Sequence, residues 1–505
     1  MTDVHPARQK PISRANGKSS PLLLYSAGHN ESRIMKHLPR IVLVVITLIL
    51  LYGTALLVFV DPNIGLELDR HYLLNDTLRF GRGFLWGAAT SAYQVEGNCT
   101  NSNWWEFESA VDKQGLPRIE RGQRSGIAAD HWRRYKEDVQ LLKEMRLNAY
   151  RFSVEWSKIE PEEGIFADSA LDHYERVVDE LRANGIEPFI TLHHFTNPLW
   201  FERKGGFERD DSPEILARFA RRVAGRLGPK VRFWATVNEP NVYAAEGYYS
   251  GTFPPGKQNP ARAILVFRNL LRAHTACYLA IKEADPEAQV GLPISVFIID
   301  PAEKWNLLDV LLAHYLNKAY TVSAVEYLTT GVYDLSLPGI GTDHYESGIP
   351  DAFDFVGLNY YSRIYCHFKP FAEEKFVAVA PPLTAMQADN GWEIYKEGLI
   401  RALYMISSRT GKPIYITENG IADDSDQKRA TFIEDHVLTA NRAIFERMNV
   451  RGYFYWSLMD NFEWTHGFDK RFGLYAVDYA TQKRTVRQGS LKYKEIVMTW
   501  ARRLR

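Results

Sequence analysis

The chain has 505 residues, of which 46% are hydrophobic, so it is long and apolar enough for a large buried core. Its 61 basic and 61 acidic side chains cancel, which excludes the overall positive field of a nucleic-acid-binding protein. The cysteines lack metal-like spacing and exclude a disulfide framework, although one bridge among Cys99, Cys277 and Cys366 stays open.

The amino-terminal part predicts a membrane anchor. Residues 1–40 are rich in Pro, Ser, Lys and Arg without apolar periodicity, which indicates a flexible tail. Residues 41–60 form an uncharged apolar run with the length of a transmembrane helix, too long for the apolar part of a cleaved signal. We therefore expect a retained signal anchor. The tail is basic and the segment after residue 60 is acidic, so the tail should be cytoplasmic and the rest extracytoplasmic.

The remainder predicts a short stem and one domain. Residues 61–79 are interpreted as the stem, and residues 80–505 as one domain because they contain no linker-like stretch and no internal repeat. In a eukaryotic host, Asn75-Asp76-Thr77 and Asn98-Cys99-Thr100 would be glycosylation acceptors on the extracytoplasmic side.

Eight short apolar runs, rich in β-branched and aromatic residues, alternate with amphipathic helix-like stretches in this domain. They are residues 84–90, 149–156, 187–195, 231–240, 289–296, 354–361, 413–420 and 451–460. Such alternation predicts a parallel sheet covered by helices, and eight strands favour closure into a (β/α)8 TIM barrel with long strand-to-helix loops. An open doubly wound sheet is the rival, disfavoured because no glycine-rich phosphate fingerprint follows an early strand.

Polar residues stand at the carboxyl ends of these runs, where barrel enzymes place their chemistry. They are Glu155, His194, Asn238, Glu239, Asn359, Glu418, Asn419 and Asp460. Glu239 ends the fourth run and Glu418 the seventh, so strand order brings two carboxylates to one mouth of the barrel. Glycoside hydrolysis requires such a pair, because one carboxyl protonates the departing oxygen while the other meets the anomeric carbon.

Seven motifs, among them FLWGAATSAYQVEG, YRFSVEWSKIEP, TVNEP, YITENG and YWSLMDNFEW, appear in the order typical of one enzyme family. Through them the chain resembles glycoside hydrolase family 1, the β-glucosidase family, over residues 80–490. The resemblance implies a retaining β-glycosidase that hydrolyses terminal unphosphorylated β-D-glycosides, of glucoside or galactoside type, through a covalent glycosyl-enzyme. It implies Glu239 as acid/base and Glu418 as nucleophile, with no cofactor and no metal.

The same resemblance implies two partners for the nucleophile. Arg151 is expected to keep Glu418 ionised through its fixed positive charge. Tyr361 is expected to donate a hydrogen bond to Glu418, whereas Tyr360 faces the opposite way and should be core.

The same resemblance implies the residues that bind the sugar. They are Gln94, His194, Asn238, Glu463 and Trp464, with Trp456 as an aromatic floor beneath the ring. The Trp456–Ser457 peptide is expected to be cis, as in the family. His193 and His274 are interpreted as structural histidines.

Three alternatives bear on the function. Family members that act on 6-phosphorylated sugars carry serine in place of Glu463, so an unphosphorylated sugar is expected. Klotho-like co-receptors have lost catalytic glutamates, and the presence of both here disfavours a binding module. A membrane-tethered transglycosylase acting on glycolipids stays open, because the anchor suits such a substrate and the motifs do not distinguish acceptors. The preferred sugar, the aglycone and the oligomeric state are not determined by the sequence.

Overall fold

A computed structural model describes residues 28–75, 77–337, 341–369, 371 and 376–503. Contacts divide the chain into two units, Met1–Val58 and Phe59–Arg505. Residues 1–27 of the predicted tail, with Arg8, Lys10, Arg14 and Lys18, lie outside the described residues, as does Asp76 of the first sequon.

The first unit contains helix α1 (Gly28–Phe59). Its His37–Phe59 portion is long and apolar enough to cross a membrane. The helix begins inside the segment predicted to be flexible, because the sequence between Gly28 and the apolar run is rich in good helix formers, with Pro39 as the exception.

The second unit is built on a closed barrel of eight parallel strands, in the order β1-β2-β3-β4-β5-β9-β12-β13. The strands are β1 (Leu85–Ala89), β2 (Ala149–Ser153), β3 (Glu187–His193), β4 (Phe233–Val237), β5 (Gln289–Ser295), β9 (Phe355–Asn359), β12 (Ile414–Asn419) and β13 (Val450–Trp456). Strand β1 pairs with both β2 and β13, which closes the barrel. Each predicted run overlaps one barrel strand, although β13 begins one residue before its run, so the TIM-barrel prediction is confirmed and the doubly wound sheet is excluded.

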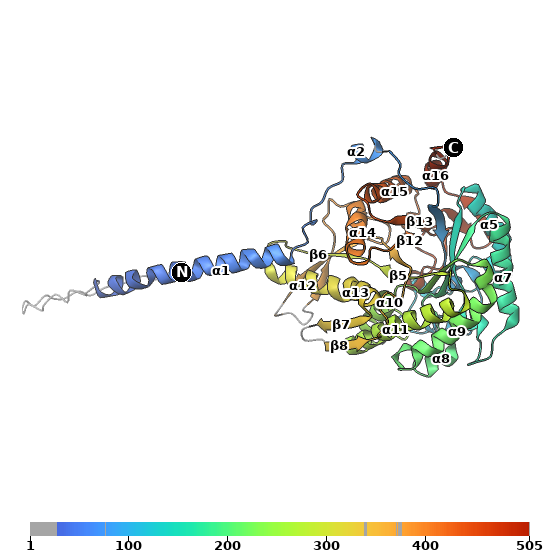
Figure 1. Cartoon of the computed structure of the whole chain (residues 1–505), viewed down its shortest axis with the longest axis horizontal. Coiled ribbons are helices and arrows are strands. Elements are labelled where there is room, and N and C mark those ends of the chain that lie inside the picture. Colours follow the sequence, from blue (N-terminus) through green and yellow to red (C-terminus); the bar gives the residue numbers. More distant parts are fainter. Residues whose placement is uncertain (1–27, 76, 338–340, 370, 372–375, 504–505) are drawn as a thin grey trace, which may run out of the picture. The chain divides into compact units, whose positions relative to one another are not determined.

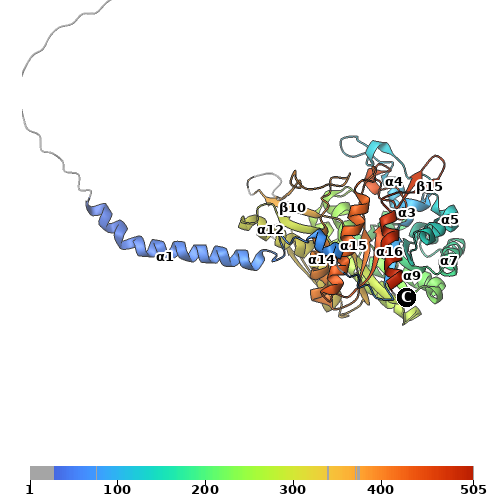
Figure 2. The same cartoon turned by 90° about the horizontal axis from the view of Figure 1, so that it is seen from above.

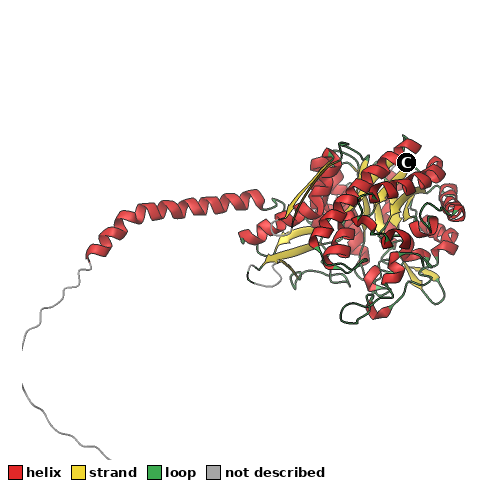
Figure 3. Cartoon of the chain, turned by 90° about the horizontal axis from the view of Figure 1, so that it is seen from below, coloured by secondary structure: helices red, strands yellow, loops and turns green. Residues whose placement is uncertain are grey.

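Helices surround the barrel (Figure 1), and the same arrangement is visible in Figure 3, where helices are red and strands yellow. The main outer helices are α5 (His131–Glu144), α7 (Asp168–Ala183), α9 (Ser212–Leu227), α11 (Pro260–Ala284), α13 (Ser323–Thr330), α14 (Lys396–Thr410), α15 (Arg429–Phe445) and α16 (Leu491–Arg503). Helix α9 illustrates why they form: it buries Ile215, Leu216, Phe219 and Val223, which recur at helical spacing on one face.

Aromatic rings fill the barrel interior towards the amino ends of the strands. Phe233 and Phe355 begin β4 and β9, and Phe189 stacks on Phe233 with the ring centroids 5.5 Å apart. Glycine makes room for these rings, since a Cβ on Gly291 would lie 2.4 Å from Cε2 of Phe355. The filled interior leaves the carboxyl ends of the strands as the place for polar groups.

The long loops predicted at that end carry structure of their own. Strands β6 (Ile298–Pro301), β10 (Arg363–Phe368) and β11 (Phe376–Val379) form a separate sheet, accompanied by α12 (Leu307–Asn317). The hairpin of β14 (Tyr475–Asp478) and β15 (Lys483–Val486) belongs to the last of these loops, between β13 and α16. A second hairpin, β7 (Val332–Leu337) with β8 (Gly341–Glu346), lies instead in the connection from α13 to β9.

Residues 61–79, predicted as a stem, pack against the barrel helices. Asp61 accepts hydrogen bonds from Arg401 of α14, and Arg70, which begins α2 (Arg70–Asn75), pairs with Glu434 and Asp435 of α15. In Figure 2, α14, α15 and α16 follow one another along this side of the body. Asp61 and Arg70 therefore have buried or half-buried partners in the barrel helices.

The three cysteines are free thiols, so the bridge left open by the sequence is not formed. Each is buried: Cys99 before α4 (Asn103–Phe107), Cys277 in α11 and Cys366 in β10. Burial raises the pKa of Cys366 to about 12, which makes its thiolate scarce at neutral pH.

Candidate active site

The two glutamates singled out by the sequence lie together at the carboxyl end of the barrel. Glu239 follows β4, and Glu418 is the residue before the last one of β12. Both are buried, with 7% and 4% of their surface exposed. Asn359, at the end of β9, donates through Nδ2 to Oε1 of Glu239 at 2.9 Å. The carboxylates are near enough for the charge of Glu418 to raise the pKa of Glu239.

Glu239 is held in its protonated form. Burial and the charge of Glu418 raise the pKa of Glu239 to about 8, although the hydrogen bond from Asn359 and the charge of Arg151 oppose the shift. Its backbone φ is +44°, a left-handed conformation that costs about 1–3 kcal/mol in a residue other than glycine and that clusters at functional sites. A neutral carboxyl at neutral pH is suited to donate a proton.

Glu418 has an environment that favours its charge. Arg151 of β2 donates through Nη1 to Oε1 of Glu418 at 2.5 Å, and the Tyr361 hydroxyl donates to Oε2 at 2.7 Å. Burial raises the pKa of Glu418, while Arg151 and Tyr361 lower it. Arg151 therefore acts in the predicted direction, but desolvation is the larger effect. Since only Glu418 has the guanidinium contact, the proton of the pair resides on Glu239.

Amide side chains connect the carboxylates to the neighbouring strand ends. Asn238 accepts from Nη2 of Arg151 at 2.5 Å and donates to Nε2 of His194 at 3.2 Å. Asn359 donates to Asn238 as well as to Glu239, and its own Oδ1 accepts from Thr417 at 2.6 Å. The bridging role of Asn359 was not foreseen, although its position at the end of the sixth run was the available signal.

The predicted sugar ligands gather beside this pair. Gln94 donates through Nε2 to Glu463 at 3.3 Å, and His194 lies nearly parallel to both Trp456 and Trp464, with ring centroids 5.8 and 6.0 Å apart. Burial raises the pKa of Glu463 to about 8, and the charge of Glu418 adds to this. The Trp456–Ser457 peptide is cis, as expected from the resemblance.

Other residues marked in the sequence face away from the site. The Tyr360 hydroxyl donates to the carbonyl of Tyr395, Nε2 of His193 contacts Oδ1 of Asn197, and His274 bridges Thr236 and the carbonyl of Ala352. Their interpretation as core residues is confirmed. Glu155 and Asn419 also turn away: Glu155 accepts from Ser157 and Thr196, and Asn419 bonds Tyr360 and Tyr453.

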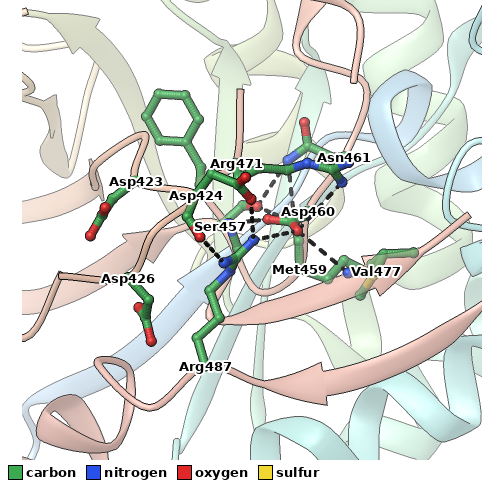
Figure 4. A network of polar contacts seen from close by, with 12 residues as sticks. Asp423, Asp424, Asp426, Ser457, Met459, Asp460, Asn461, Arg471, Val477 and Arg487 are labelled. Atoms are coloured by element: carbon green, nitrogen blue, oxygen red, sulfur yellow. Dashed lines mark hydrogen bonds and ion pairs between the residues drawn. The ribbon is translucent and has the colours of Figure 1, made fainter. Parts of the chain in front are cut away.

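Asp460 supports the loop that carries Glu463 and Trp464. Its carboxylate accepts from the Gly473 amide at 3.0 Å and from Nη2 of Arg487 at 2.8 Å, and Asn461 next to it donates to Ser457 (Figure 4). Both Asp460 and Arg487 are almost fully buried, so this ion pair fixes the segment between the cis peptide and the sugar ligands.

Replacing Asp460 with Asn should lower the free energy of unfolding by about 3 kcal/mol, because Arg487 loses its buried counter-charge. It should also raise KM, since the loop of Glu463 is less constrained. Denaturant unfolding and steady-state kinetics measure the two effects. Asp478→Asn, at an exposed position of β14, is the matched control and should behave like the wild type; equal stability of both variants would contradict this role for Asp460.

Known proteins share this architecture. The sequence profile of the family described as "Glycosyl hydrolase family 1" matches residues 76–501. Beta-glucosidase A of Thermotoga maritima is 34% identical over 446 residues, which cover 83% of this chain and 98% of that protein.

Two solved structures superpose on the chain. A β-glycosidase from Pyrococcus horikoshii does so with a TM-score of 0.75 at 37% identity, covering 84% of this chain and 95% of the other. A β-glucosidase from Thermotoga maritima in complex with deoxynojirimycin does so with a TM-score of 0.76 at 31% identity, covering 84% and 99%. With the family profile spanning most of its length, the chain belongs to glycosyl hydrolase family 1 and is a glycoside hydrolase of the retaining β-glycosidase type.

Proposed function

We propose that the chain hydrolyses terminal, unphosphorylated β-D-glucosides or β-D-galactosides, with Glu418 as nucleophile and Glu239 as acid/base. The observation that carries the proposal is the contrast between two neighbouring buried carboxyls. Glu418 is paired with Arg151 and Tyr361, whereas the pKa of Glu239 is raised to about 8. Pairs of carboxyls with such divergent environments divide the nucleophilic and acid roles between them.

In the first step, Glu239 gives its proton to the glycosidic oxygen while a carboxylate oxygen of Glu418 bonds to the anomeric carbon. The aglycone leaves as an alcohol, and the sugar remains as an ester of Glu418. Ester formation removes the negative charge that helped to raise the pKa of Glu239. Glu239 then becomes a base for the second step: it takes a proton from water, whose oxygen displaces Glu418 and restores the β configuration.

The sugar itself is proposed to contact Gln94, His194, Asn238, Glu463 and Trp464 above the Trp456 ring. A hydrogen bond between the Asn238 side chain and the 2-hydroxyl would strengthen as positive charge develops on the sugar. Structures of the Thermotoga maritima relative in complex with deoxynojirimycin and with galacto-hydroximolactam support a ligand of this kind for the chain.

The test is a panel of p-nitrophenyl glycosides with the full chain. We expect the β-glucoside or the β-galactoside to be the best substrate, and the corresponding 6-phosphate to be hydrolysed at least about tenfold less well, because Glu463 would face the phosphate dianion. No turnover of any unphosphorylated β-glycoside would contradict the proposal, and preference for the 6-phosphate would contradict its sugar assignment.

We also propose that residues 41–60, all but the last of which belong to α1, form a retained signal anchor, with residues 1–40 in the cytoplasm and the catalytic domain on the other side. The length and apolar character of His37–Phe59 and the basic residues before it support this orientation. The chain should stay with membranes during alkaline carbonate extraction; its release into the supernatant would count against the anchor. No specific observation favours the transglycosylase or the co-receptor alternative.

A further inference from the structure

An apolar cavity of about 390 Å³ lies among the long loops of the barrel. Its walls are formed by α11, α12 and the sheet of β6, β10 and β11, with residues such as Ile264, Phe267, Ile299, Leu316 and Ile364. No lining residue that the structure describes carries a charge. A cavity of this size and character suits a hydrocarbon group rather than a second sugar.

The cavity comes close to the proposed acid, although Glu239 is not itself one of the residues that line it. Asn241, two residues beyond Glu239, forms part of the wall, as does Tyr320 from the helical turn Lys318–Val322. Burial raises the pKa of Tyr320 most, and the charge of Glu239 is the next largest cause. Because Glu239 protonates the oxygen that joins sugar and aglycone, atoms beyond that oxygen lie on the Glu239 side. The cavity is therefore placed to receive the aglycone.

Residues 59–61, the first of the second unit, lie next to two of the elements that line this cavity. Phe59, the first residue of that unit, packs edge-on against His314 of α12, with ring centroids 5.0 Å apart. Asp61 accepts from Nη2 of Arg401 at 2.7 Å, and the same nitrogen donates to Asp300 of β6 at 2.7 Å. Asp300 follows Ile299, and Leu316 lies two residues beyond His314, so residues 59–61 are fixed to two walls of the cavity.

The surface around α12 exposes large aromatic and apolar side chains of the kinds found at membrane interfaces. Trp305, Leu308 and Tyr315 are 69%, 49% and 38% exposed. Trp and Tyr are favoured at the boundary between lipid and water because each combines an apolar ring with a polar group. Residues 59–61, these side chains and two of the elements that line the cavity thus lie in the same part of the second unit.

We propose that the cavity binds the hydrocarbon chain of a membrane-resident glycolipid whose β-linked sugar occupies the catalytic site. This inference rests on the proposed function and adds the class of aglycone to it. The reaction is the same hydrolysis: the glycosidic bond breaks, water supplies the proton and hydroxyl, and the products are the free sugar and a lipid alcohol.

The dependence of kcat/KM on the length of an alkyl aglycone tests whether the cavity binds a hydrocarbon chain. With the full chain in lipid nanodiscs, kcat/KM for alkyl β-glycosides of the preferred sugar, each below its micelle concentration, should rise at least about tenfold from methyl to octyl as methylenes are buried. Ala319→Trp, which fills the cavity, and Ile364→Asp, which places a charge in it, should each reduce the octyl-to-methyl ratio at least about fivefold. Leu279→Asp, at an exposed position of α11 outside the cavity, should keep the wild-type ratio.

The outcomes separate the two proposals. A flat chain-length profile with good turnover of the methyl glycoside would overturn the cavity assignment and leave the hydrolase intact. Unchanged octyl-to-methyl ratios in both cavity variants would also overturn it. Absence of turnover throughout would overturn the proposed function and this inference together.

A second arm tests the membrane source. The full chain is reconstituted in vesicles, and hexadecyl β-glycoside is placed either in the same vesicles or in separate ones. Hydrolysis should be at least about tenfold faster in the same vesicles, because a chain of that length leaves a bilayer slowly. Equal rates would overturn the assignment to a membrane-resident lipid.

Discussion

Replacing Glu418 with Gln is expected to lower kcat on p-nitrophenyl β-glucoside by roughly 10⁴-fold or more. Glutamine has the shape of glutamate but lacks the negative charge needed to attack the anomeric carbon. The variant keeps one oxygen that can accept from Arg151, and its amide nitrogen can donate to the Tyr361 hydroxyl, so the fold should be retained. Initial rates of nitrophenol release, with circular dichroism to verify folding, measure the effect.

Glu155→Gln is the matched control for this variant. Glu155 is a buried carboxyl at the same end of the barrel, but it accepts from Ser157 and Thr196 and does not reach the site. It should keep kcat within a few-fold of the wild type. A folded Glu418→Gln protein with wild-type turnover would remove Glu418 from the mechanism.

Replacing Glu239 with Gln is expected to lower kcat/KM by about 10²- to 10⁴-fold on alkyl glycosides, whose leaving groups need protonation. The loss should be much smaller on 2,4-dinitrophenyl glycosides, whose leaving group departs without a proton. Comparing the two substrates separates the loss of an acid from general damage to the site. Equal losses on both would contradict the acid role of Glu239.

The pH profile gives the same variant a second readout. Wild-type kcat/KM should fall as the pH rises through about 8, because Glu239 is active as acid only when protonated and its pKa is raised to about 8. At the other end it should fall as the pH drops through the raised pKa of Glu418, which must be ionised to attack. Glu239→Gln should lose the alkaline limb and keep the acid limb. An unchanged alkaline limb would assign that ionisation to another group.

The barrel could be predicted from the sequence because its strands are buried on both faces. Continuous runs such as residues 187–195 and 354–361 stand out against helical stretches with one apolar face. The shared location of Glu239 and Glu418 could be predicted for a related reason: in a parallel barrel all carboxyl ends meet, so a polar residue ending a strand has a known destination. Their roles, and sugar ligands such as Gln94, were implied by the family resemblance.

Contacts between distant segments could not be predicted in this way. Asp61 and Arg70 resemble exposed residues in sequence, and their partners Arg401 and Asp435 lie hundreds of positions away. Asp460 shows the converse limit: it ends the eighth predicted run, beyond the last residue of β13, and it turns to Arg487 and supports the site indirectly. Strand position indicates which end of the barrel a side chain occupies, but packing decides which way it points.

The direction in which Arg151 shifts the pKa of Glu418 could be predicted, but not the net shift after burial is included. Arg151 favours the charged form of Glu418, as the family resemblance implied. The pKa of Glu418 is nevertheless raised, because the depth of burial contributes more and is not encoded locally.

The most direct test of the central claim is to trap the covalent intermediate. A 2-deoxy-2-fluoro-β-glycoside with a dinitrophenolate leaving group reacts in the first step, while the fluorine slows the second by opposing positive charge on the sugar. Mass spectrometry of the digested full chain should find one fluorosugar per protein, attached to the peptide that contains Glu418. A fluorosugar on another residue, or an active enzyme whose first product is the α-anomer, would contradict the account.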